Sequence, residues 1–223
     1  MELNKIYNED CLEGMKRIPD NSVDLVVTDP PYLIRYKTGH RKNKEHKFCH
    51  EIMNDSNQEL ISLYIRNCYR ILKENTAAYI FCSSKTLSLF LREAENAGFK
   101  LKNTIIWVKN NWTAGDLKAQ YGQQYECILY LNKGRCFING KRITDVWCFD
   151  RVSGNALIHQ NQKPVQLIEQ CIIKSSQEGN LVYDGFMGSG TTAIACINTK
   201  RNYIGFEIDK EYYDLSIKRI NNL

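Results

Sequence analysis

The sequence predicts a doubly wound α/β fold built on a mostly parallel sheet. Short apolar runs typical of buried strands alternate with amphipathic segments of about a dozen residues along most of the chain. Strands that alternate with helices of this length form sheets covered by helices on both faces. The 223 residues suffice for one sizeable core and are few for two, so we expect a single domain over residues 1–223.

Seven strands and six helices are expected, and several are bounded by residues that suit their ends. The strands are expected at 4–8, 23–28, 77–82, 104–108, 127–131, 181–183 and 203–208. The helices are expected at 11–18, 58–72, 86–97, 164–175, 191–198 and 211–220. Apolar residues run together in the strands and recur every three or four positions in the helices. Pro19 ends the first helix, two prolines stop the strand that ends at Thr28, Gly98 ends the third helix and Pro164 opens the fourth.

Two long segments, 33–56 and 133–160, show no clear periodicity and are expected to contact a partner. Within the first, residues 33–50 hold six cations and one acid, a surplus equal to the +5 of the whole chain. Concentrated positive charge suits contact with phosphates, although a solvated loop also explains it. The second segment carries cations beside aromatic patches, and either reads a target or forms a surface hairpin without that role.

The composition favours a soluble, cytoplasmic protein without a membrane partner. No apolar run approaches the length of a membrane span, and the first residues lead directly into a strand. The nine cysteines contain no Cys-x-x-Cys pair, which excludes zinc ribbons and thioredoxin-like motifs. His40, His46, Cys49 and His50 fit no familiar zinc spacing, so no metal is expected.

A glycine-rich turn runs from Asp184 to Thr192, between an expected strand and an expected helix. Glycine lets the backbone adopt a positive φ and approach a ligand, and the helix start offers free N–H groups. The lysine that a phosphate loop needs after Gly190 is absent. A dinucleotide site, a pocket for a nucleoside with a sulfonium group, and an ordinary strand-to-helix turn remain open. In the sulfonium pocket, Asp184 binds an amino group and Glu207, at the end of the next strand, accepts hydrogen bonds from ribose.

The tetrapeptide Asp29-Pro30-Pro31-Tyr32 is more specific, since it places a carboxylate, two prolines and an aromatic ring at the end of a buried strand. The exocyclic amine of adenine or cytosine is a poor nucleophile because its lone pair is delocalised into the ring. The Asp29 carboxylate and the Pro30 carbonyl can each accept one amine hydrogen, which favours a pyramidal nitrogen and stabilises the positive charge of the transition state. Tyr32 can stack on a base removed from the duplex. A proline turn that merely ends the strand is the alternative.

Together these motifs resemble those of the DNA amino-methyltransferases, in the permuted order called the β group. Asp29-Pro30-Pro31-Tyr32 is similar to the target-amine motif, and the glycine-rich turn is similar to the cofactor motif, with Gly185 where proline is common. Residues 7–12, 159–164 and 203–207 resemble three further family segments. The resemblance extends over roughly residues 1–32, 60–131 and 158–221.

The resemblance implies a seven-stranded, Rossmann-like methyltransferase sheet with one antiparallel strand, and S-adenosylmethionine as the cofactor. It implies methylation of adenine N6 in double-stranded DNA after base flipping. The implied catalytic residues are Asp29, Pro30, Pro31 and Tyr32, and the implied cofactor-binding residues are Asp10, Asp29, Lys163, Asp184, Phe186, Gly188, Ser189, Gly190, Thr191, Thr192 and Glu207. The expected DNA contacts are Arg35, Lys37, Arg41, Lys42 and Lys44 in the basic segment, and Lys133, Arg135, Lys141 and Arg142 in the target-recognition segment. A homodimer and a cognate restriction endonuclease are further partners that the family suggests.

Ligands of a doubly wound sheet bind where the strand order reverses. We therefore expect the strands that end at Asp29 and Asp184 to lie side by side, so that the methyl donor faces the amine acceptors.

Other functions remain open. The family's N4-cytosine enzymes more often carry serine in place of the aspartate, so Asp29 favours adenine. RNA is a further substrate to consider, and a DNA-binding module that has lost catalysis is disfavoured by the intact Asp29, Tyr32, Asp184 and Glu207. Methyltransferases of protein glutamine carry a similar Asn-Pro-Pro-Tyr motif, but their cofactor motif precedes it, the reverse of the order here.

Overall fold

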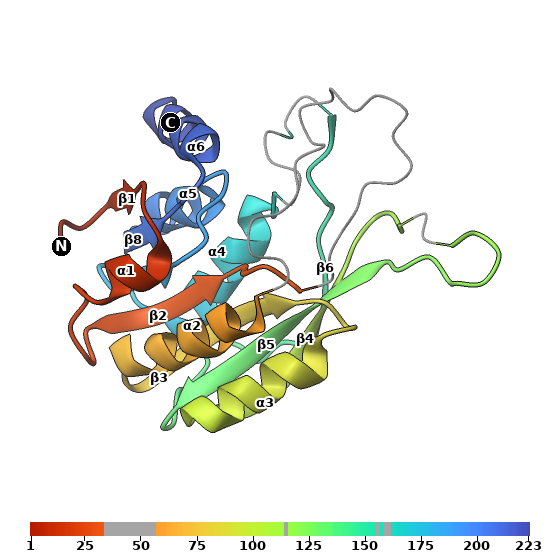
Figure 1. Ribbon diagram of the computed structural model, residues 1–223, viewed down its shortest axis with the longest axis horizontal. Coiled ribbons are helices and arrows are strands. Elements are labelled where there is room, and N and C mark those ends of the chain that lie inside the picture. The colour runs from red at the N-terminus through yellow and green to blue at the C-terminus, as the bar shows by residue number, and fades with distance from the viewer. Residues whose placement is uncertain (34–56, 114–115, 155–156, 158–161) are drawn as a thin grey trace.

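The computed structural model describes residues 1–33, 57–113, 116–154, 157 and 162–223. In this part of the chain, eight strands form one sheet in the order β1-β8-β7-β2-β3-β5-β4-β6 (Figure 1). The strands are β1 (Lys5–Tyr7), β2 (Val23–Thr28), β3 (Leu72–Cys82), β4 (Lys100–Val108), β5 (Tyr125–Lys133), β6 (Val146–Cys148), β7 (Leu181–Asp184) and β8 (Asn202–Phe206). The helices are α1 (Cys11–Met15), α2 (Gln58–Ile71), α3 (Leu87–Ala97), α4 (Val165–Ser175), α5 (Thr191–Asn198) and α6 (Lys210–Asn221).

The prediction of a mostly parallel sheet with one antiparallel strand is confirmed. Only β5 runs against its neighbours β3 and β4, whereas every other pair of adjacent strands in the described chain is parallel. The predicted number of seven strands is wrong, because β6 adds an eighth within the segment expected to be irregular. This strand has three residues, of which only Trp147 is buried, so it is too short to give a periodic signal.

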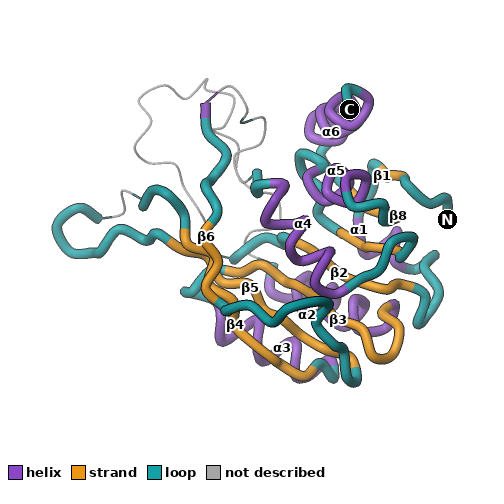
Figure 2. Tube along the Cα trace, turned by 180° about the vertical axis from the view of Figure 1, so that it is seen from behind, coloured by secondary structure: helices purple, strands orange, loops and turns teal. Residues whose placement is uncertain are grey.

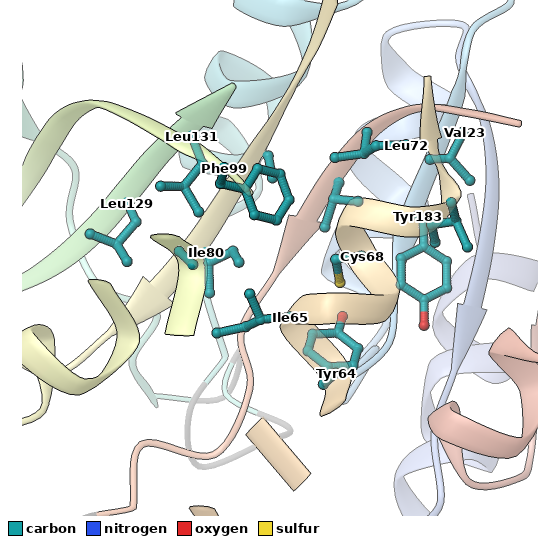
Figure 3. Packing of buried hydrophobic residues seen from close by; sticks show 14 of the residues in the cluster. Val23, Tyr64, Ile65, Cys68, Leu72, Ile80, Phe99, Leu129, Leu131 and Tyr183 are labelled. Atoms are coloured by element: carbon teal, nitrogen blue, oxygen red, sulfur yellow. The ribbon is translucent and has the colours of Figure 1, made fainter. Parts of the chain in front are cut away.

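Helices cover both faces of the sheet, as the two opposite views show (Figures 1 and 2). On one face, α1, α2 and α3 pack in a buried cluster in which Tyr64, Ile65 and Cys68 of α2 lie among side chains of the strands (Figure 3). On the other face, α4 and α5 pack against alternate residues of the same strands. Strands buried on both faces read as unbroken apolar runs, which explains why 23–28 is recognisable in the sequence.

The strand order reverses between β2 and β7. From β2 the chain passes through α2 to β3 on one side, and from β7 it passes through α5 to β8 on the other. Because β2, β3, β7 and β8 are parallel, their carboxyl ends share one edge, called the carboxyl edge below. The antiparallel β5 begins at this edge with Tyr125, which pairs with Val108 at the end of β4.

None of the described helices combines the length and the apolar character that crossing a membrane would require.

Candidate active site

The two sequence motifs meet at the reversal point, as expected. Leu25 and Val26 of β2 pair with Val182 and Tyr183 of β7. Just beyond this ladder, the Thr28 hydroxyl donates to Asp184 Oδ1 at 2.9 Å. Since Asp29 directly follows Thr28, the target-amine motif and the glycine-rich turn are neighbours in space.

The glycine-rich turn depends on two residues with positive φ. Gly188 has a φ of 50°, and Gly190, which caps the N-terminus of α5, has a φ of 76°. A Cβ on Gly190 would lie 3.0 Å from Cβ of Ser216 in α6, so both backbone strain and close packing favour glycine there. Ser189, Thr191 and Thr192 follow the same turn and are buried. The turn thus presents the start of α5 to the carboxyl edge.

Asp184 is buried and accepts three hydrogen bonds. Its Oδ1 accepts from the Thr28 hydroxyl and from the Phe186 N–H at 3.0 Å, and its Oδ2 accepts from the Thr192 hydroxyl at 2.6 Å. Burial raises the pKa of Asp184 to about 6, although these three donors favour the ionised form. Asp184 therefore ties β2, β7 and α5 together, and its predicted contact with the cofactor stays a prediction.

Two other predicted cofactor residues also hold backbone in place. Glu207, which follows β8, accepts from the Gly188 N–H at 2.7 Å and from the Asp209 N–H at 2.9 Å, and burial raises its pKa. Asp10 Oδ1 accepts from the N–H groups of Leu12 and Glu13 and so caps α1. Both carboxylates lie at the carboxyl edge, where β1 and β8 end side by side.

Asp29 stands in a small network of charges. Its Oδ2 accepts from Lys163 Nζ at 2.5 Å and its Oδ1 accepts from the Tyr32 hydroxyl at 2.6 Å. The Lys163 ammonium also lies 5.4 Å from the centre of the Tyr32 ring. Pro30 is buried and Pro31 is half-buried beside them. Lys163 was expected beside the cofactor, and the structure shows it bound to the expected catalytic aspartate.

Two further residues, Glu126 and Lys109, which are not among the predicted site residues, complete this network. Glu126 Oε2 lies 2.7 Å from the Tyr32 hydroxyl and 3.2 Å from Lys163 Nζ, and its Oε1 accepts from Lys109 Nζ at 2.5 Å. In the sequence, Glu126 is recognisable as an acid directly before the apolar run 127–131. Its meaning depends on the antiparallel pairing of β5 with β4, which brings Glu126 and Lys109 together at the carboxyl edge.

The two carboxyl groups of the network differ in pKa. Burial raises the pKa of Asp29, with Lys163 opposing and Glu126 adding to the rise. Burial also disfavours ionisation of Glu126, but Lys163 and Lys109 outweigh it and lower the pKa to about 2. The pKa of Lys163 is raised, because its two carboxylate partners outweigh the burial of its ammonium. Such divergent acids in one cluster are typical of catalytic sites.

The structure describes only some of the residues predicted to contact DNA, and it contradicts the prediction for one of them. Arg35, Lys37, Arg41, Lys42 and Lys44, like the histidines considered above for zinc, lie outside the described residues. The prediction for Lys133 is wrong: this side chain is buried, and its ammonium donates to Asn21 Oδ1 and to the carbonyls of Tyr69 and Leu72. A lysine held by three oxygen acceptors inside the protein cannot reach a phosphate.

Arg135, Lys141 and Arg142 lie away from the carboxyl edge. Arg135 follows the end of β5 that pairs with the start of β3, and the carbonyl of Lys141 accepts from Lys174 at the far end of α4. Because α4 has 11 residues and begins next to Lys163, its far end is about 16 Å from the site. The contact of these three side chains with DNA stays a prediction.

A different segment projects from the carboxyl edge. Residues 109–113 and 116–124, between β4 and β5, form the green loop of Figure 1. Three large apolar side chains of this segment are exposed: Trp112, Leu117 and Tyr121. Solvent-facing aromatic side chains beside a site mark a surface for a partner.

Comparison with known proteins identifies relatives across most of the chain. A family model described as DNA methylase, covering N6 and N4 methyltransferases, matches residues 23–218. The type II methyltransferase M.BglII of Bacillus subtilis is 31% identical over 258 aligned positions, which cover 96% of this chain and 68% of that protein. M.HpaI of Haemophilus parainfluenzae is 30% identical, with 98% of this chain and 74% of that protein covered.

Solved structures agree with this result. The M1.HpyAVI complex with S-adenosylmethionine is 30% identical, has a TM-score of 0.76 and is covered to 98%, against 97% of this chain. The cytosine-N4-specific PvuII DNA methyltransferase has a TM-score of 0.79 at 18% identity, with 98% of this chain and 87% of that chain covered, which shows a shared fold.

Proposed function

This chain belongs to the DNA methylase family of N6 and N4 methyltransferases, and from this premise we propose that it methylates the exocyclic N6 of adenine in double-stranded DNA with S-adenosylmethionine. The observation that carries the proposal is the contact between β2 and β7. It brings the amine acceptor Asp29 next to the glycine-rich turn through the Thr28–Asp184 hydrogen bond. We further propose that residues 1–223 form one methyltransferase domain of the permuted β group, with 33–56 and 133–160 as insertions that contact DNA.

The residues at the carboxyl edge fit S-adenosylmethionine, which supplies an electrophilic methyl group when bound. Gly188 and Gly190 have positive φ and no Cβ, so a ligand can approach the backbone closely beside the start of α5. Glu207 would accept hydrogen bonds from the ribose hydroxyls, and Asp184 would accept from the amino group. A positive ligand group near Asp184 would offset the cost of ionising this buried carboxyl. Asp10 would lie toward the adenine.

The chain's own residues prepare the target amine. The Asp29 carboxylate and the Pro30 carbonyl accept one amine hydrogen each, so the nitrogen lone pair points to the methyl group. Transfer of the methyl group would form the new N–C bond from this lone pair as the C–S bond of the bound cofactor breaks, and the nitrogen would become positively charged. Asp29 then accepts the proton that the nitrogen releases. The ring of Tyr32 stacks on the flipped base and holds it in line.

The choice of adenine depends on Asp29. The fold does not decide it, since the cytosine-N4-specific PvuII enzyme has the same architecture. N4-cytosine methylation is therefore the second candidate, favoured by that likeness alone. A DNA-binding module without catalysis is the third, and the intact network around Asp29 argues against it.

The experiment is methyl transfer to unmethylated genomic DNA. The purified protein is incubated with labelled S-adenosylmethionine, and the DNA is digested to nucleosides and analysed by mass spectrometry. We expect N6-methyladenine from the wild type, and a rate lower by about 10²-fold or more for Asp29→Ala. N4-methylcytosine would establish the second candidate, and no methylated base together with tight DNA binding would establish the third.

We propose that the duplex lies on the carboxyl edge, against residues 109–113 and 116–124. Arg135, Lys141 and Arg142 would touch a duplex only where it extends beyond that edge. The double variant Lys141→Ala plus Arg142→Ala tests whether the bound duplex extends as far as these two residues. A salt slope of DNA binding lower by about two shows contact with both cations, and an unchanged slope limits the duplex to the carboxyl edge.

The type II methyltransferases among the relatives suggest a cognate restriction endonuclease as functional partner, and we also propose a homodimer. Sedimentation of the purified protein measures its oligomeric state. Sequencing of modified bases in DNA from cells that express the chain gives the recognition sequence to which such an endonuclease would correspond.

A further inference from the structure

Both oxygens of Asp29 are already engaged in this structure. Tyr32 donates to Oδ1 at 2.6 Å and Lys163 donates to Oδ2 at 2.5 Å. A carboxylate oxygen can accept two hydrogen bonds, but a target amine that donates to Asp29 must share an oxygen with Tyr32 or Lys163 and so competes with that group for the carboxylate. A buried ammonium or hydroxyl that loses its acceptor costs about 1 to 3 kcal/mol or more, so displacement is slow unless another acceptor is near.

Glu126 stands where such an acceptor is needed. Its Oε2 lies 3.2 Å from Lys163 Nζ and 2.7 Å from the Tyr32 hydroxyl. The Tyr32 hydroxyl has a single hydrogen, so it donates to Asp29 or to Glu126 but not to both at once. Lys163 is likewise within reach of both carboxylates. Small movements of these two side chains therefore transfer their hydrogen bonds from Asp29 to Glu126.

We propose that Glu126 is a positioning residue that takes over Lys163 and Tyr32 when the target amine binds to Asp29. The proposal rests on the proposed function, since it is the target amine of methyl transfer that competes with Lys163 and Tyr32 for Asp29. It assigns the cluster two arrangements: one in which Lys163 and Tyr32 occupy Asp29, and one in which they move to Glu126 and the target amine occupies Asp29.

Lys109 makes Glu126 suitable for this role. Its ammonium binds Glu126 Oε1 at 2.5 Å and lies 5.1 Å from the centre of the Trp107 ring, which fixes it in place. The side chains of Lys109 and Glu126 are only 18% and 15% exposed, so the pair is largely shielded from water. Glu126 therefore stays ionised and oriented, with Oε2 directed at Lys163 and Tyr32.

The cluster is electrically balanced in both arrangements. It contains two carboxylates, Asp29 and Glu126, and two ammonium groups, Lys163 and Lys109. Lys163 exchanges one carboxylate partner for the other, and Asp29 accepts from the target amine, whose nitrogen becomes positive only when the methyl group is transferred. Each charged group of the cluster therefore keeps a hydrogen-bond partner in both arrangements.

The test compares single-turnover methylation by the wild type and by Glu126→Gln over a range of pH. Glutamine keeps the shape and one acceptor oxygen but removes the charge, so Lys163 stays on Asp29. We expect the rate to fall at least tenfold with unchanged S-adenosylmethionine affinity in calorimetry. We expect Glu126→Asp, which retains the charge, to recover part of the rate. Glu74→Gln, which removes an exposed acid of β3 far from the carboxyl edge, is the matched control and should leave the rate unchanged.

The pH profile separates this role from a merely structural one. The charged groups that face Asp29 are Lys163 before α4, Glu126 on β5 with Lys109 behind it, and Asp184 on β7, and Tyr32 faces it from its own segment. Because the charge of Glu126 raises the pKa of Asp29, Glu126→Gln should move the acid limb of the rate to lower pH. Lys163→Met removes the opposing cation and should move the limb to higher pH.

A rate of Glu126→Gln within about threefold of the wild type, or an acid limb that stays in place in both variants, overturns the proposal. If Glu126→Gln does not fold, the shift in Lys163→Met and the partial recovery in Glu126→Asp still decide it. A wild type that methylates no DNA would instead refute the proposed function, so the two failures are distinguishable.

Discussion

Replacing Asp184 with asparagine should remove a pH dependence from the stability of this protein. The pKa of Asp184 is raised from 3.8 to about 6 by burial between β7, β2 and α5. Between these two values the folded protein binds more protons at this group than the unfolded chain does. The contribution of this carboxyl group to the free energy of unfolding is therefore fully present below pH 3.8 and is lost as the pH rises through 6.

The magnitude follows from the difference in pKa. Each pKa unit corresponds to about 1.36 kcal/mol, so ionisation of Asp184 lowers the free energy of unfolding by about 3 kcal/mol in total. About 1 kcal/mol of this loss falls between pH 5 and pH 7. Asparagine keeps an oxygen for Thr28 and Phe186 and loses the charged acceptor of Thr192, which costs about 1 to 2 kcal/mol at every pH.

The assay is urea unfolding of the wild type and the variant at several values of pH from 5 to 7.5. The difference between their free energies of unfolding should shift by about 1 kcal/mol in favour of Asp184→Asn as the pH rises. Titrating groups that do not interact with Asp184 contribute equally to both proteins and cancel in this difference, whereas Glu207, whose pKa the charge of Asp184 helps to raise, does not cancel completely. Glu178→Gln, at an exposed ion pair, is the control for the loss of one carboxylate elsewhere. A difference that stays constant with pH would refute the inference that Asp184 is a buried acid with a raised pKa.

Three further predictions concern single residues. Tyr32→Phe keeps the ring that stacks on the base and should retain most of the methylation rate. Tyr32→Ala should lower the methylation rate by about 10- to 100-fold, since stacking contributes about 1 to 3 kcal/mol. Equal losses of rate in the two variants would contradict the stacking role. Lys133→Met should lower the free energy of unfolding by about 2 kcal/mol in urea titrations, because the buried carbonyl of Leu72 and two partly buried acceptors lose their donor. A loss of DNA affinity without destabilisation would restore the original prediction for this residue. Gly190→Ala should lower the free energy of unfolding by about 1 to 2 kcal/mol, because Gly190 has a φ of 76°. It should also weaken S-adenosylmethionine binding in calorimetry. Unchanged values of both quantities would show that the turn tolerates a side chain.

Much of the architecture can be predicted from the sequence because its signals are local. The run 23–28 is apolar throughout since both faces of β2 are covered, and the two prolines after it end the strand. The glycines of the turn are visible because the backbone there needs a positive φ. The neighbouring positions of Asp29 and Asp184 also followed, from the general rule on where strand order reverses.

The errors arose where the local signal is weak or ambiguous. The strand β6 has one buried residue and is defined by its pairing with β4, which no periodicity reports. Lys133 looks like a surface cation in the sequence. Its burial follows from the register of β5 on β3, which places its ammonium against the end of α2 and against Asn21, just before the start of β2.

By itself, the sequence determined the alternation of strands and helices, the turn that requires glycine and the presence of a carboxylate at the end of a buried strand. These depend on backbone geometry and on apolar periodicity, which act over a few residues. Only the tertiary structure decided which charges face one another. Asp29 meets Lys163 across 134 residues, and Tyr32 meets Glu126 across 94, since the fold brings the end of β2 and the starts of β5 and α4 to one edge. Electrostatic interaction depends on distance in space, and distance along the chain carries almost no information about it.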